Sequence, residues 1–148
     1  MALPNVQVTL TNNNLGLQAP SQNGVSVVLV AAPAAPAAGY GTPFLVAGMA
    51  DVETAFADPA NAPVVAAFAK GYYAEAPEGT RCYVLAMAPT TTLETLLAPA
   101  NAEKALNAAA GEARLLAAIK FPGELYNPTI SGGFDGDVHA AVTAAQTL

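Results

Sequence analysis

The side chains best suited to chemistry lie near the carboxyl end, in a glycine-rich stretch at residues 131–137. Asp135 and Asp137 could share a cation with backbone carbonyl oxygens, because hard cations prefer oxygen ligands. An EF-hand loop, however, needs a longer ligand set that ends in a distal glutamate, and no such set follows. We therefore interpret the stretch as a turn in which Asp137 caps the next helix, and we expect no metal site.

The other reactive side chains are scattered along the chain. Cys82 is the single cysteine, so an intrachain disulfide is excluded, and its position in a predicted strand indicates a buried, unreactive thiol. His139, the single histidine, lies far from Cys82 in the sequence. Glu75 and Glu78 fall at the end of a predicted helix, where solvated turn residues are a better interpretation than an acid/base pair. Glycine-rich nucleotide loops and nucleophile elbows are absent. We expect neither enzymatic activity nor a cofactor.

The composition indicates a chain whose surface is poor in charge. Its 148 residues fit one domain, or one domain with an arm. Charged residues make up 11% of the chain, against about 25% in a typical soluble domain. This shortage suggests that other subunits cover parts of the surface. The alternative interpretation is a small, alanine-rich monomer.

The charge distribution argues against two classes of partner. The net charge is −6, and the basic residues form no cluster that could neutralise phosphates. These basic residues are Lys70, Arg81, Lys104, Arg114 and Lys120. The longest apolar run, residues 25–38, contains Pro33 and Pro36 and is too short to span a bilayer. The amino terminus shows no secretory signal. We expect neither nucleic acid nor a membrane as a partner.

Strands and helices are expected to alternate from residue 25 onward. Residues 25–30 are rich in β-branched side chains and apolar on both faces, which predicts a central strand. Helical crossovers favour parallel pairing, so the predicted fold is α/β, an open, mostly parallel sheet flanked by helices. Asn101 is the expected cap of a late helix, and Gly111 its stop. Further strands are expected at residues 44–47, 80–87 and 113–119, and the last of these segments is also compatible with a helix. Helices are expected from residue 49 and over residues 62–74, 92–97, 101–110 and 138–146. Loops are expected at residues 31–41 and 121–136.

An additional strand is expected near the amino terminus. Val6, Val8 and Leu10 alternate with polar residues, the period of a half-buried strand, and a loop over residues 12–24 separates them from the body. Such a strand can pair with its own sheet or add to a neighbour's exposed edge, so these three residues are the candidate binding residues. We divide the chain into an arm at 1–23 and an α/β domain at 24–148. Because a strand should follow the last helix in an alternating order, we expect the domain to continue or that helix to pack on a partner.

Several segments carry a resemblance to a known family when taken in order. They are residues 24–30, residues 41–46 followed by Asp-Val-Glu-Thr-Ala-Phe at 51–56, residues 64–73, and Gly-Thr-Arg-Cys-Tyr-Val at 79–84. Together they resemble the amino-terminal portion of contractile phage tail sheath proteins, and residues 14–25 resemble a phage- or prophage-derived branch of that family. Two features depart from the family. A complete sheath protein is usually much longer, with a carboxyl-terminal domain and a second exchange arm. Sheath proteins also typically open with Pro-Gly-Val-Tyr, where this chain has Leu-Pro-Asn-Val.

The resemblance implies a structural role. Sheath subunits stack as rings around an inner tube, their terminal strands augment neighbouring sheets, and they catalyse nothing. The implied partners are copies of the chain and a tail tube protein, and the implied location is the virion tail, assembled in the cytoplasm of a bacterial host. The alternative hypothesis is a small-ligand-binding α/β domain without catalysis, since open parallel sheets bind ligands beyond the carboxyl ends of their strands.

Overall fold

The computed structural model describes residues 25–76, 79–121, 130–131 and 133–148. The predicted amino-terminal strand, with its candidate binding residues Val6, Val8 and Leu10, lies outside the described residues.

One four-stranded sheet organises the domain. Its strands are ordered β2-β3-β1-β4, and β1 runs parallel to both β3 and β4. The short β2 is antiparallel to β3. The predicted α/β class, with a mostly parallel sheet and a central first strand, is confirmed. The strands span Val25–Ala31 (β1), Pro43–Val46 (β2), Cys82–Met87 (β3) and Ala113–Lys120 (β4).

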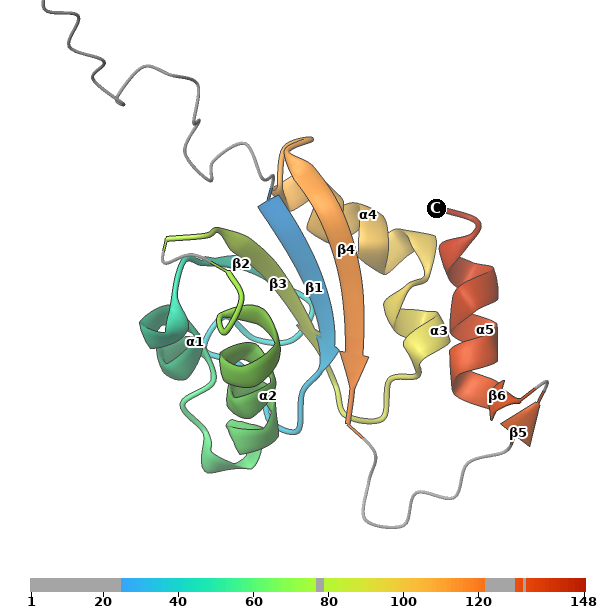
Figure 1. Cartoon of the computed structure of the whole chain (residues 1–148), viewed down its shortest axis with the longest axis horizontal. Helices are drawn as coiled ribbons and strands as arrows, with labels where there is room; N and C mark the ends of the chain where they lie inside the picture. The colour runs from blue at the N-terminus through green and yellow to red at the C-terminus, as the bar shows by residue number, and fades with distance from the viewer. Residues whose placement is uncertain (1–24, 77–78, 122–129, 132) are drawn as a thin grey trace, which may run out of the picture.

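Helices cover both faces of this sheet. Figure 1 shows α1 and α2 on one side, α3 and α4 on the other, and α5 outside α3. A 3₁₀ turn at Pro59–Asn61 precedes α2, and a π-helical turn at Phe68–Tyr72 extends it. The helices span Met49–Ala55 (α1), Ala62–Ala67 (α2), Leu93–Leu96 (α3), Pro99–Ala108 (α4) and Gly136–Ala145 (α5).

Alternation along β1 builds two hydrophobic cores. Val28 and Val30 face the core under α1 and α2, while Val27 and Leu29 face the core under α3 and α4. All four side chains are buried. Burial on both faces explains why this strand is apolar apart from Ser26, as expected of a central parallel strand.

Two helix starts differ from the expectation. Asn101 lies inside α4 rather than at its cap, because Pro99 occupies the first turn and begins the helix earlier. Asp137 is not the cap of α5; Asp135 is, and its side chain accepts a hydrogen bond from the Asp137 amide. The predicted loop at 121–136 also contains a small hairpin, β5 (Ile130–Ser131) with β6 (Phe134–Asp135).

Candidate functional site

The two borders of the sheet differ in how open they are. At one border, β2 has four residues and begins with Pro43, whose nitrogen cannot donate a hydrogen bond. At the other border, β4 has eight residues, without proline, and pairs with β1 alone among the described residues. Short edges and prolines discourage pairing with other chains, whereas a long unprotected edge invites it. The β4 edge is therefore the part of the described sheet best suited to accept another strand.

One face of β4 adds an apolar surface to this edge. Leu115, Ala117 and Ile119 point to the side of α1 and α2; we call these three residues the β4 strip. Ala117 and Ile119 are only partly buried against the core, and Leu115 is 55% exposed. On the opposite face, Leu116 and Ala118 pack against the core under α3 and α4. The β4 strip thus leaves apolar area available beside unpaired backbone groups.

A second exposed apolar area lies on α5 and the hairpin before it. After Asp137 the sequence carries no charged side chain. The helix buries Ala141 but exposes large apolar side chains on its outer surface. Polar side chains are also present on this helix, at Asp137, His139 and Thr143, so the exposed apolar residues form a part of its surface and not all of it. The exposed residues of this area are Ile130, Phe134, Val138, Val142 and Leu148.

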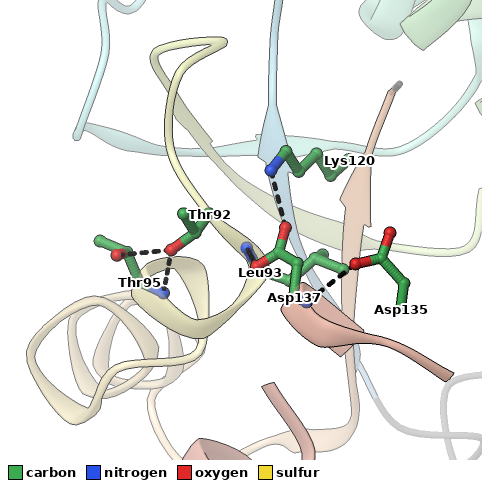
Figure 2. A network of polar contacts seen from close by, with 6 residues as sticks. All are labelled: Thr92, Leu93, Thr95, Lys120, Asp135 and Asp137. Atoms are coloured by element: carbon green, nitrogen blue, oxygen red, sulfur yellow. Dashed lines mark hydrogen bonds and ion pairs between the residues drawn. The ribbon is translucent and has the colours of Figure 1, made fainter. Parts of the chain in front are cut away.

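A polar network fixes α5 to the carboxyl ends of the strands (Figure 2). Asp137 accepts a hydrogen bond from the Leu93 amide at 2.9 Å and forms an ion pair with the Lys120 ammonium at 2.7 Å. The side chains of Lys120 and Asp137 are 26% and 20% exposed. One carboxylate therefore ties together the end of β4, the start of α3 and the start of α5. Thr92 caps α3 beside it by accepting from the Thr95 amide.

This arrangement bears on ligand binding, because ligands of open parallel sheets use donors at the carboxyl ends of the strands. Here Lys120 and the Leu93 amide already donate to Asp137, so this carboxylate occupies two of the donors at that end of the sheet. Asp135 is likewise engaged as the cap of α5, and His139 is exposed on that helix. Within the described ranges, no three His, Cys, Asp or Glu side chains gather in a way that could hold a metal ion.

Aromatic side chains surround the single cysteine. The rings of Tyr72 and Tyr73 meet edge to face, with centroids 4.9 Å apart, and Phe68 contacts both. The predicted burial of Cys82 is confirmed, and this burial raises the pKa of its thiol to about 12. Burial also raises the pKa of Tyr72 and of Tyr73. The cluster therefore stays neutral near pH 7, as a packed core does.

A surface hollow of about 530 Å³ lies between the start of α1, Tyr73 and Gly79. Its described lining is mainly apolar, and the one carboxylate among those residues, Asp51, accepts a hydrogen bond from the Ala47 amide at 2.8 Å. Among the lining residues that the structure describes, no convergent polar groups gather of the kind that fixes the orientation of a small ligand.

Sequence reasoning missed the two features that matter most here. The openness of β4 depends on the order of the strands, and the sequence pattern of residues 113–119 did not predict that order. The partners of Asp137 lie 17 and 44 residues away, so local spacing carries no signal for them.

The helices of the described residues include none long and apolar enough to cross a membrane.

Comparison with known proteins identifies the family. The model for DUF2586, N-terminal domain, matches residues 3–148, so the chain belongs to this family. No curated protein and no solved structure matches the chain.

Proposed function

We propose that this DUF2586-family chain is a structural virion protein, a tail-sheath-like subunit that assembles with copies of itself around a tail tube. Its place is the virion tail, and it assembles in the cytoplasm of the bacterial host. The observation that carries the proposal is the eight-residue edge of β4, which has no second partner strand among the described residues, with the β4 strip beside it. An assembly of subunits would cover such an edge, as well as the apolar outer surface of α5.

The segments that resemble sheath proteins support the proposal because they form one continuous part of the fold. They supply β1, β2, α1, α2 with its π-helical turn, and β3. These elements are the two inner strands, one border strand and the whole helical layer on one face of the sheet. The resemblance thus follows a structural unit rather than scattered pieces.

The most specific of these segments, at residues 79–84, has a structural explanation at several positions. Gly79 has a φ of 83°, a conformation that favours glycine, and lies in the turn shortly before β3 begins. Arg81 forms an ion pair with Glu112, the residue directly before β4. Cys82 and Val84 are fully buried. The segment serves packing and connection, which agrees with a subunit that builds a structure and catalyses nothing.

Deleting residues 1–11 tests the proposal, because these residues include the candidate strand with Val6, Val8 and Leu10. We expect sedimentation velocity to show large species for the intact chain and much smaller ones for the truncated chain. Circular dichroism should remain the same, since the described core does not include these residues.

Point variants sharpen this test. Val8→Lys places a charge on the apolar face of the predicted strand and should reduce the oligomer size. Gln7→Lys places the same charge on the polar face and serves as the matched control. Unchanged oligomer size after both the deletion and Val8→Lys would contradict strand exchange as the basis of assembly.

A further inference from the structure

We infer that α5 of one copy packs on the β4 strip of the next copy and covers a part of the sheet face that the described helices leave open. Resting on the proposed function, the contact names two surfaces through which neighbouring copies meet. It uses the face of β4 and not its edge, so it is independent of strand addition at that edge.

The receiving surface is the β4 strip. On the same face of the sheet, α1 and α2 cover the inner strands, and Val30 of β1 and Val84 of β3 are fully buried. This cover decreases toward the border, where Ala117 and Ile119 are partly buried and Leu115 is 55% exposed. Because helices normally cover both faces of a mostly parallel sheet, the β4 strip is suited to receive one more helix.

The inserting surface is one side of α5. Val138, Val142 and Ala145 follow the i, i+4, i+7 spacing of a single helix face, and all three are exposed; we call them the α5 stripe. Phe134, directly before the helix cap, is exposed as well. Ala141, in contrast, is buried against the body of the molecule. The α5 stripe is therefore an exposed apolar helix face of the kind that packs on a sheet.

The two surfaces agree in spacing and in size. Val138 and Val142 lie about 6 Å apart along the helix axis, at about 1.5 Å per residue. Alternate residues of β4 lie about 6.6 Å apart along the strand, at about 3.3 Å per residue. A helix that lies along β4 therefore keeps the two rows of side chains in step. Ala117 is the small residue between Leu115 and Ile119, so a valine of the helix can pack over it between the larger neighbours.

Charge does not oppose this contact. The sequence has no charged side chain after Asp137, and the three residues of the β4 strip are apolar. Arg114 belongs to the opposite face of β4, because successive side chains of a strand alternate, and Lys120 is paired with Asp137. Copies with a net charge of −6 can therefore meet at these two surfaces without placing like charges against each other.

The two surfaces cannot meet within one copy. The β4 strip faces the side of α1 and α2, whereas Figure 1 shows α5 on the other side of the sheet, next to α3. Asp137 holds the start of α5 there through the Leu93 amide and Lys120. The contact thus joins different surfaces of successive copies, and contacts of this head-to-tail kind build rings where they close and filaments where they do not.

Complementation between two lysine variants tests the inference. Val142→Lys places a charge in the α5 stripe, near the carboxyl end of the helix, where lysine suits the helix dipole. Leu115→Lys places a charge in the β4 strip. In sedimentation velocity, each variant alone should self-associate about tenfold more weakly than the intact chain, since the contact would bury an unpaired charge. When the two are mixed, each should bind the other more tightly than it binds itself, because Val142→Lys keeps its β4 strip and Leu115→Lys keeps its α5 stripe.

Two matched controls carry the same charge elsewhere. Thr143→Lys places it on another side of α5, and Leu45→Lys places it on β2 at the other border of the sheet. Neither should change self-association. All four positions are exposed, so circular dichroism should be the same for all four variants. Equal self-association of Val142→Lys and Thr143→Lys would overturn the inference, and so would a mixture of Val142→Lys and Leu115→Lys in which neither binds the other.

Failure of this contact has a different signature from failure of the proposed function. If both lysine variants assemble like the intact chain while deletion of residues 1–11 abolishes assembly, the contact is wrong and the proposed function stands. If the lysine variants lose self-association while the deletion changes nothing, the contact stands and the exchange of the amino-terminal strand fails. An intact chain that sediments as a monomer at every concentration would contradict both.

Discussion

Replacing Asp137 with alanine should destabilise the domain substantially, because this carboxylate fixes α5 to the body. Asp137→Ala removes the ion pair with Lys120 and the hydrogen bond from the Leu93 amide in one step. It also leaves the Lys120 ammonium without its partner in a site where that side chain is 26% exposed.

The size of this effect follows from the burial of the pair. A hydrogen bond to a charged group contributes about 1.5–3 kcal/mol, whereas an exposed ion pair contributes about 0–1 kcal/mol. Since the pair is mostly but not fully buried, we expect Asp137→Ala to lower the free energy of unfolding by about 2–3 kcal/mol. Asp137→Asn keeps an acceptor for the Leu93 amide and should cost about 1–2 kcal/mol.

Urea denaturation followed by circular dichroism measures both values. The matched control is Glu112→Gln, which breaks the ion pair with Arg81, where the side chains are 49% and 55% exposed. That variant should cost less than about 1 kcal/mol. If Asp137→Ala and Glu112→Gln have the same effect, the polar network does not hold α5 as we have reasoned.

Three further predictions concern the core. Because burial raises the pKa of Cys82 to about 12, iodoacetamide at mildly alkaline pH should leave the native thiol unmodified and alkylate it once urea unfolds the chain; fast alkylation of the native protein would contradict this. Burial also raises the pKa of Tyr73 in the folded state above its ordinary value of about 10. The free energy of unfolding should therefore be constant below about pH 10 and fall as the pH rises above that value. A free energy of unfolding that does not change with pH above about 10 would contradict this prediction. Phe56→Ala removes a buried ring packed between Phe44 and Phe68 and should cost about 3–5 kcal/mol, whereas Phe134→Ala, at a 63% exposed position, should stay within about 0.5 kcal/mol in the same urea assay.

The elements that local patterns specify were predictable from the sequence. The β-branched residues of β1 indicated a central strand because both of its faces are buried. Crossover helices indicated parallel pairing, which β3 and β4 adopt with β1. The pattern of β4 was compatible with either a strand or a helix, and its pairing with β1 decides for the strand.

The features that depend on tertiary contacts were not predictable in this way. Local spacing allows either Asp135 or Asp137 to cap α5, and the Lys120 and Leu93 partners of Asp137 become apparent only in the folded chain. Similarly, β4 has one partner strand among the described residues because it lies at the border of the sheet and β2 occupies the opposite one. The candidate residues of the arm remain a prediction, since they lie outside the described residues.

Negative-stain electron microscopy of the concentrated protein, produced from its complete natural reading frame, tests the central claim most directly. A tail-sheath-like subunit should form rings, tubes or striated sheaths, and these should disappear when residues 1–11 are deleted. Discrete, monodisperse particles at every salt and protein concentration would contradict the structural role and favour a standalone α/β module.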